Sequence, residues 1–139
     1  MNKTDRTLKI LLDTNFLIVP FQFRLNLQAE FDKLLDRKYE LILLKEIYDE
    51  LNHILKKSNG KKRQEIQAAI KYFESFPKQD LSKREPNENI DDFLVRVALE
   101  NKYIVATNDK GLKRKLRRLK INYIDLRQRN HFKIKNTLI

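Results

Sequence analysis

The chain has 139 residues, 30 of them basic and 19 acidic, and its formal net charge of +11 favours nucleic acid or an anionic membrane as a partner. Cysteine is absent, which excludes disulfides, thiolate metal sites and a cysteine nucleophile, and two histidines are too few for a histidine-rich zinc site. Any metal ion would therefore be held by oxygen atoms, which points to a hard cation such as Mg²⁺ or Mn²⁺.

The first half of the chain alternates short apolar runs with amphipathic stretches. Asn26 is of a residue type that caps helix N-termini, and Pro20 is expected to end a short helical turn. In chain order, the predicted elements are a strand at 8–12, a helical turn at 14–19, a helix at 26–37, a strand at 40–44 and a helix at 45–57.

The second half continues this alternation apart from one polar stretch. Residues 78–89 include Pro86 and predict a loop with at most one short strand near residues 80 and 81. Pro77 is expected to end the helix that precedes the loop. The other predicted elements are helices at 62–76 and 91–101, a strand at 103–106, a basic helix at 110–119 and a last strand at 122–126.

Strands that alternate with helices predict a three-layer α/β/α fold, in which helices cover both faces of a central parallel sheet. A single domain over residues 1–128 accounts for this pattern, and a second domain is not needed. Residues 129–139 are expected to form a basic C-terminal tail. No apolar run approaches the roughly 20 residues that span a bilayer, and residues 1–7 lack the apolar core of a signal peptide. We therefore expect a soluble cytoplasmic protein without a membrane partner.

Four acidic residues occupy positions where a metal site can form. Asp13 and Asp109 follow predicted strands, and the carboxyl ends of parallel strands are where ligands collect in such sheets. Asp91 opens a predicted helix, beside Asp92. Glu50 borders the buried stripe of its own predicted helix, given about 3.6 residues per turn. Clustered carboxylates can hold Mg²⁺, which activates water and stabilises the leaving oxygen when a phosphodiester is hydrolysed.

Each of these acids also has a simpler explanation. Asp13 and Asp109 suit turns or helix caps, Asp91 suits a helix cap, and Glu50 suits a solvated helix face. Spacing alone therefore leaves both interpretations open.

The order of short motifs along the chain adds a further observation. The motifs are Asp13-Thr14-Asn15 after the first strand, Glu50-Leu51 in mid-chain, Asp91 with Ala98 seven residues later, and Thr107-Asn108-Asp109 after a later strand. In this order they resemble the motifs of the PIN-domain ribonucleases. The resemblance covers roughly residues 8–127, nearly the whole chain.

The resemblance implies a PIN-like fold in which four acids bind Mg²⁺ or Mn²⁺ and act in catalysis, with three further residues in support. The four acids are Asp13, Glu50, Asp91 and Asp109, and the supporting residues are Asn15, Asp92 and Thr107. Within the family, the runs 13–23 and 106–116 look most like the archaeal and eukaryotic group linked to ribosomal RNA processing. Bacterial-type toxins share the acids but not usually the Pro-Phe-Gln run at 20–22.

Basic residues are concentrated after Asp109. From residue 110 to the end there are eleven Lys or Arg residues and a single acid, Asp125. A positive surface beside an acidic metal site suits a polyanionic substrate, although a solvated helix face is the alternative explanation. The residues expected to contact RNA are Lys110, Lys113, Arg114, Arg117, Arg118 and Lys120.

Four other residues are weaker candidates for contact with RNA. Phe21 and Phe23 could stack on bases, but a place in the core or in a protein interface is the stronger expectation. His131 and Phe132 could touch RNA, and a loose chain end is at least an equal expectation.

Together these observations predict an endoribonuclease that hydrolyses RNA with divalent metal ions, with a role in ribosomal RNA processing. Two alternatives stay open: a non-cleaving PIN-like module that binds RNA or protein, and the toxin nuclease of a toxin–antitoxin pair. The assembly is open as well, with a second copy of the chain, a ribosome-assembly protein or an antitoxin-like protein as candidate partners. A phosphotransfer site with an Asp-x-Asp pair does not fit, because Asn15 stands two residues after Asp13.

Overall fold

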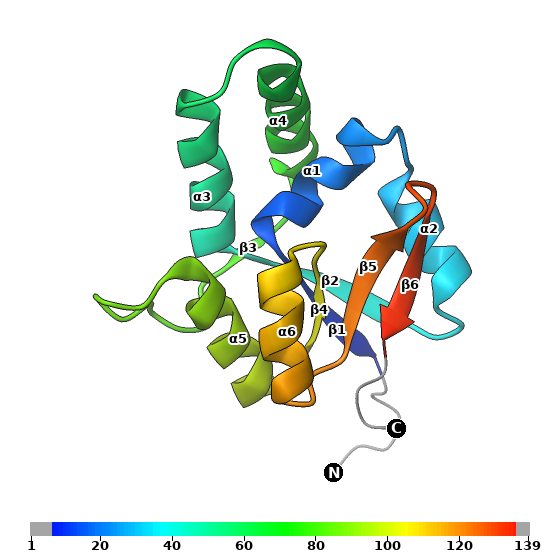
Figure 1. The fold of residues 1–139 in the computed structure, drawn as a ribbon, viewed down its shortest axis with the longest axis vertical. Helices are drawn as coiled ribbons and strands as arrows, with labels where there is room; N and C mark the ends of the chain where they lie inside the picture. The colour runs from blue at the N-terminus through cyan, green and yellow to red at the C-terminus, as the bar shows by residue number, and fades with distance from the viewer. Residues whose placement is uncertain (1–6, 136–139) are drawn as a thin grey trace.

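A mostly parallel sheet organises the molecule (Figure 1). The computed structural model describes residues 7–135, so the expectations for residues 1–6 and 136–139 lie outside the described part of the chain. The strands, in sheet order, are β3 (Lys78–Gln79), β2 (Tyr39–Leu44), β1 (Leu8–Leu12), β4 (Ile104–Ala106), β5 (Tyr123–Arg127) and β6 (His131–Lys135). All neighbouring strands in this order pair in parallel except β5 and β6, which are antiparallel.

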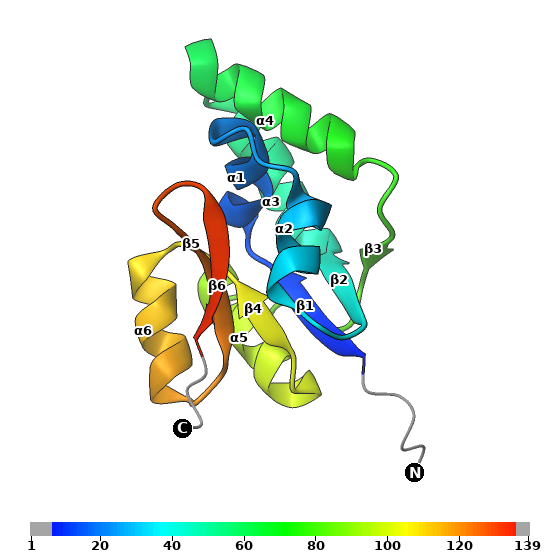
Figure 2. The same ribbon diagram turned by 90° about the vertical axis from the view of Figure 1, so that its right-hand side faces the viewer.

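Helices flank this sheet and complete the predicted three-layer α/β/α fold. They are α1 (Thr14–Gln22), α2 (Leu27–Leu34), α3 (Lys45–Lys56), α4 (Gly60–Phe73), α5 (Ile90–Asn101) and α6 (Lys110–Arg118). In Figures 1 and 2, α5 and α6 lie side by side on one face and α2 lies on the other, near β6. Helices α1, α3 and α4 pack together beyond the end of the sheet where β1 and β2 finish. None of these helices has both the length and the apolar character to cross a membrane.

The two central strands, β1 and β4, end at the same level. Leu12 pairs with Ala106, and the backbone N–H of Asp13 donates to the Ala106 carbonyl at 3.0 Å. Both strands are apolar and fully buried at Ile10 and Val105, because helices cover both faces of the sheet. The residues that follow Leu12 and Ala106 therefore emerge together at one edge of the sheet.

Pro20 does not end the first helix, contrary to the prediction, and α1 continues to Gln22. A proline inside a helix removes one backbone hydrogen bond and crowds the preceding turn. Here the helix is nevertheless retained, because Phe16 and Leu17 on α1 are completely buried. The last turn is closed past the proline by the N–H of Phe23, which donates to the Val19 carbonyl at 3.0 Å. Burial of the apolar face of α1 thus outweighs the tendency of Pro20 to end a helix.

Other element boundaries differ from the predictions by a few residues. The helix predicted at 26–37 ends at Leu34, and the helix predicted at 62–76 spans 60–73. The short strand predicted near residues 80 and 81 lies at Lys78–Gln79, where it pairs with the end of β2. Helix ends and short edge strands depend on tertiary contacts, which residue patterns describe least well.

The segment expected to be a basic tail from residue 129 contains a strand instead. Residues 131–135 form β6, which pairs with β5 along its whole length. Phe132 is only 4% exposed, and its ring packs on those of Phe16 and Phe31 at centroid distances of 5.0 and 4.9 Å. The prediction of a loose end with Phe132 free to touch RNA is therefore wrong, because this side chain belongs to the core.

Candidate active site

Three aspartates and one threonine gather at the sheet edge formed by the ends of β1 and β4. Asp13 follows β1 directly and caps the N-terminus of α1. Thr107 and Asp109 follow β4, and Asp109 caps the N-terminus of α6. Asp91 lies in the first turn of α5, which is the neighbour of α6. We refer to Asp13, Asp91 and Asp109 as the aspartate cluster.

Asp13 is the most buried member of the cluster, with 5% of its surface exposed. Its Oδ1 accepts a hydrogen bond from the backbone N–H of Thr14 at 2.8 Å, and its Oδ2 accepts one from the Thr107 hydroxyl at 2.7 Å. Burial raises the pKa of Asp13 to about 6, the bonds from Thr107 and Thr14 oppose this rise, and the charges of Asp91 and Asp109 add to it. The two bonds thus hold the carboxyl group in one orientation, and they only partly offset the effect of its burial on the pKa.

Thr107 joins two of the aspartates through a single hydroxyl group. Its Oγ1 donates to Asp13 and accepts a bond from the backbone N–H of Asp109 at 3.1 Å. Asp109 in turn accepts a bond on Oδ2 from the backbone N–H of Leu112 at 2.7 Å, which is the usual bond of a helix cap. Asp109 is therefore a helix cap through its Oδ2 atom. Its Oδ1 atom has no hydrogen bond in the described part of the chain, so it could also bind a cation.

Asp91 is half-buried on the other side of the cluster. Burial raises its pKa, and the charge of Asp109 raises it further, whereas Lys115 acts in the opposite direction and Asp92 adds a smaller rise. Asp92 itself is exposed and forms an ion pair with Lys115 at 2.8 Å. The mutual influence of Asp91, Asp109 and Asp13 shows that three acids distant in sequence share one electrostatic environment.

Two further residues that the family resemblance implies come from α3 and α1. Glu50 lies half-buried on α3, and it is not among the charges that raise the pKa of Asp13 or Asp91. Asn15 is exposed in the first turn of α1. Their roles in the site therefore stay predictions.

The cluster has the donor set for a hard cation, although its carboxylates do not form a ready-made coordination sphere. Within residues 7–135, no three acidic or histidine side chains are arranged closely enough to hold an ion as they stand. Like charges at one site repel, and a divalent cation would relieve that repulsion. The buried Thr14 hydroxyl, next to Asp13, has no hydrogen-bond partner among the described residues, so it can donate to a bound water or accept from one. These observations fit Mg²⁺ or Mn²⁺.

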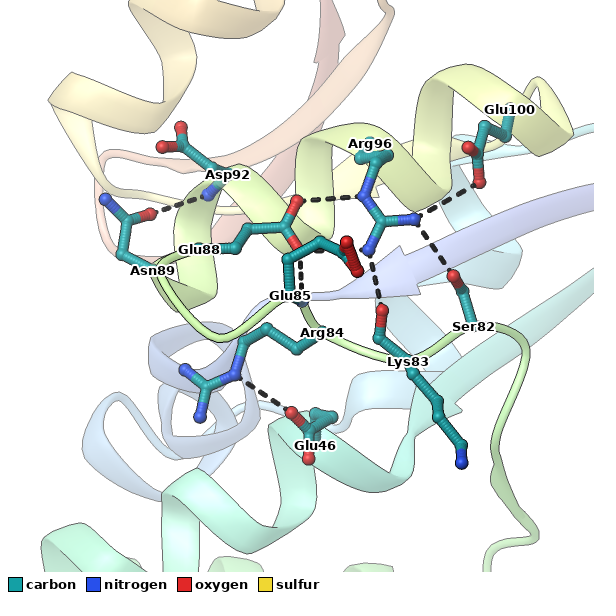
Figure 3. Close-up of polar contacts among 10 residues, drawn as sticks. All are labelled: Glu46, Ser82, Lys83, Arg84, Glu85, Glu88, Asn89, Asp92, Arg96 and Glu100. Atoms are coloured by element: carbon teal, nitrogen blue, oxygen red, sulfur yellow. Dashed lines mark hydrogen bonds and ion pairs between the residues drawn. The ribbon is translucent and has the colours of Figure 1, made fainter.

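Arg96 anchors the segment that leads into the helix of Asp91 (Figure 3). Its guanidinium donates to both carboxylate oxygens of Glu88, at 2.8 and 2.9 Å. It also donates to the Ser82 hydroxyl at 2.9 Å and to the Lys83 carbonyl at 2.8 Å. We call Arg96, Glu88, Ser82 and Lys83 the Arg96 clasp. Residue patterns gave no sign of it, since its members are 8 to 14 residues apart in a polar stretch.

The clasp continues into contacts that hold the start of α5. Asn89 caps this helix by accepting a bond from the backbone N–H of Asp92 at 2.8 Å, and Arg84 forms an ion pair with Glu46 of α3 at 3.0 Å (Figure 3). The segment predicted as a loop therefore links the start of α5, which carries Asp91, to α3.

Acid should weaken the clasp over a defined pH window. The Arg96 guanidinium, with a smaller contribution from the backbone N–H of Glu85, lowers the pKa of Glu88 to about 2. Its contribution to stability is therefore fully present above the ordinary value of 4.5 and is lost as the pH falls towards 2. We expect Glu88→Gln to unfold several degrees below the parent at pH 7, and this difference to shrink between pH 4.5 and 2 in thermal unfolding monitored by circular dichroism. Asp36→Asn, at an exposed position, is the control, and an equal loss there would discount the clasp.

The six basic residues expected to contact RNA do not share one hollow. Lys110, Lys113, Arg114 and Arg117 line a hollow of about 320 Å³ between α6 and β5. Arg118 is exposed, and Lys120 lines a different hollow, beside Leu99 and Leu119.

The aromatic candidates Phe21 and Phe23 pack against the core, with Phe21 edge-on to Tyr72. The expectation that these rings serve packing is thus the one that the structure supports.

Comparisons with known proteins agree with this architecture. A family model described as a PIN like domain matches residues 10–129. The chain is 35% identical over 129 residues to ribonuclease VapC4 of Methanocaldococcus jannaschii, which covers 91% of this chain and 95% of that protein. The solved structure of the PIN domain endonuclease Utp24 superposes with a TM-score of 0.74 at 21% identity, over 92% of this chain and 91% of the other, which shows the shared fold. The family expected from the motifs is thereby confirmed, and the chain belongs to the PIN-like domain family.

Proposed function

We propose that this chain is an endoribonuclease that hydrolyses RNA phosphodiester bonds with the aid of Mg²⁺ or Mn²⁺. The observation that carries the proposal is the aspartate cluster, in which Asp91 and Asp109 add their negative charges to that of buried Asp13 at the carboxyl edge of the sheet. A relative that is 35% identical over most of both chains bears the name ribonuclease, which supports RNA as the substrate.

Each residue of the site has a chemical task in this proposal. Asp13, Asp91 and Asp109 hold the ion, Glu50 is proposed as a fourth acid reaching it from α3, and Asn15 and Asp92 as helpers. The ion, when bound, supplies polarisation of the phosphate and an acidified water. Thr107 fixes the orientation of Asp13 through its 2.7 Å hydrogen bond, which is how second partners commonly hold metal ligands.

The basic residues next to the site would attract and position the RNA. Lys110, Lys113, Arg114, Arg117, Arg118 and Lys120 remain the proposed contacts. Lys110 directly follows Asp109, so positive charge begins where the aspartate cluster ends. Contacts between basic side chains and phosphates release counterions, and RNA affinity should therefore fall steeply as salt rises.

The cellular role that we propose is the maturation of ribosomal RNA. The resemblance of the runs 13–23 and 106–116 to the ribosomal RNA processing group supports a role in ribosomal RNA maturation. Mapping ribosomal RNA ends in cells that express the chain or its Asp91→Asn variant separates the possibilities. New ends that depend on Asp91 within precursor regions support maturation. Cuts in other RNAs, with arrest of growth, would replace this role with that of a toxin nuclease.

The metal requirement can be tested with purified protein and a labelled RNA. Cleavage should stop in EDTA and return when Mn²⁺ or Mg²⁺ is added in excess. Asp91→Asn should lower the cleavage rate by more than about 100-fold, since a lost ligand removes several kcal/mol of transition-state stabilisation. Asp36→Asn makes the same chemical change at an exposed position outside the aspartate cluster, and this variant should keep the parent rate. Full cleavage in EDTA would refute the metal requirement, and RNA binding without cleavage under all conditions would indicate a non-cleaving module.

A further inference from the structure

The hollow between α6 and β5 is lined by cations from two separate elements. Lys110, Lys113, Arg114 and Arg117 come from α6, and Arg127 comes from the end of β5. The figures show α6 and β5 side by side (Figures 1 and 2). Arg127 was not among the residues expected to bind RNA, because in the sequence it stands apart from the basic helix, after the strand that follows it.

A buried acid holds two of these cations in place. Asp125 is 1% exposed, and its two oxygens accept bonds from Lys113 Nζ at 2.6 Å and from Arg127 Nε at 2.8 Å. A third cation is fixed nearby, since Arg117 Nη1 donates to the Tyr123 hydroxyl at 2.8 Å. The side chains that flank the hollow are therefore ordered before any ligand arrives.

This arrangement suits phosphate better than a loose basic surface would. One carboxylate faces five cations, so the hollow keeps a net positive charge. The bond to Asp125 uses only Nε of Arg127, and the bond to Tyr123 uses only Nη1 of Arg117, so other N–H groups of both guanidinium groups stay available for phosphate oxygens. Side chains that are already ordered lose less conformational freedom on binding, which raises affinity for a given set of contacts.

We infer that this hollow is a phosphate subsite for the RNA strand, and that buried Asp125 organises it by fixing Lys113 and Arg127. The inference rests on the proposed function for the identity of the substrate. The scissile phosphate would lie at the aspartate cluster, and a neighbouring phosphate of the same strand would occupy the hollow. The two sites adjoin, because α6 starts at Lys110, next to Asp109, and lines the hollow along its length.

Replacing Asp125 should change the RNA affinity in the direction opposite to the one that net charge alone predicts. Replacing an acid with a neutral residue makes the protein more basic, which by itself should tighten RNA binding. If Asp125 organises the subsite, Asp125→Asn should weaken RNA binding instead, because Lys113 and Arg127 lose their common anchor. Asparagine is nearly the same size, so the packing around the position is disturbed little.

The test is the affinity for a fluorescently labelled single-stranded RNA, measured by anisotropy in EDTA. All variants carry Asp13→Asn so that the RNA stays intact, which a gel verifies. Arg127→Gln should weaken binding about tenfold and reduce the dependence of log Kd on log salt by about 0.7, the amount expected for one lost phosphate contact. Lys62→Gln on α4 makes the same charge change at an exposed position away from the hollow, and should weaken binding less than about twofold.

The possible outcomes separate the subsite from the nuclease proposal. An Arg127→Gln variant that binds RNA like Lys62→Gln would overturn the subsite, and so would tighter binding by a folded Asp125→Asn. Weaker binding by both Arg127→Gln and Asp125→Asn supports it. If Asp125→Asn does not fold, the comparison of Arg127→Gln with Lys62→Gln decides alone. Because cleavage is not measured, a chain that binds RNA here but cuts nothing would lose the proposed activity and keep the subsite.

Discussion

Replacing Asp13 with asparagine is expected to lower RNA cleavage by more than about 100-fold while leaving the protein folded. The carboxylate is the buried centre of the aspartate cluster, and loss of its charge removes a ligand for the divalent ion. The Oδ1 atom of asparagine can still accept from the Thr14 N–H, and its amide can donate to the Thr107 oxygen, which reverses the bond that the Thr107 hydroxyl donates to Asp13. Cleavage of a labelled RNA by the parent and the variant, each with saturating Mn²⁺, measures the effect. A variant within about threefold of the parent rate would remove Asp13 from the site.

The same substitution should stabilise the metal-free protein. A carboxyl group whose pKa is raised from 3.8 to about 6 in the folded state makes folding less favourable as the pH rises through this range. At about 1.36 kcal/mol for each pKa unit, the cost of the ionised group at pH 7 is about 3 kcal/mol. Asp13→Asn should therefore raise the free energy of unfolding in EDTA by up to this amount, as measured by urea denaturation. The variant should also lack the decline in stability between pH 4 and 6.

This pairing of lost activity with gained stability distinguishes a functional acid from a structural one. A residue kept for folding would lower both quantities when it is replaced. If Asp13→Asn unfolds at lower urea than the parent in EDTA, the charge of Asp13 is not the source of strain that its burial implies.

Phe132→Ala is expected to cost about 3–5 kcal/mol of stability, the usual range for removing a buried aromatic ring. The ring lies among Phe16 and Phe31, so its loss leaves a cavity between α1, α2 and β6. Urea denaturation at pH 7 measures the loss. Lys133→Ala changes the next residue of the same strand, which is exposed, and should change stability by less than about 0.5 kcal/mol. A cost below about 1 kcal/mol for Phe132→Ala would mean that β6 is held only loosely, as a tail would be.

The sheet and most helices could be predicted because their residue patterns are strong. Strand β1 ends in the apolar run Ile10–Leu12, and the amphipathic spacing in 45–57 and 91–101 gave helix limits that differ from α3 and α5 by about one residue. Such patterns reflect burial on one side of an element, which sequence periodicity records directly.

The strand β6 escaped prediction because Asn130 is the one turn-favouring residue of its three-residue turn, 128–130. Gln128 and Arg129 adopt positive φ angles of 52° and 63°, a conformation that hairpins usually assign to Asn or Gly. Neither Gln128 nor Arg129 is typical of a turn. The residues 131–135, whose side chains alternate between buried and exposed, were therefore interpreted as part of a charged chain end. The pairing with β5 is what stabilises this turn.

The candidate site was predictable to the extent that it follows strand ends. Asp13 and Asp109 could be placed near each other because β1 and β4 are parallel neighbours. The Arg96 clasp and the bonds of Asp125 could not, because they join residues whose proximity is created only by folding. The direction of Glu50 on α3 depends on its rotamer, which no helical spacing specifies.

Binding of a divalent cation by the aspartate cluster can be seen in crystals soaked in Mn²⁺ and measured for anomalous scattering. We expect one or more Mn²⁺ peaks within bonding distance of carboxylate oxygens of Asp13, Asp91 and Asp109. Crystals that diffract well but show no peak there, with Mn²⁺ bound to other acids instead, would contradict cation binding by the cluster.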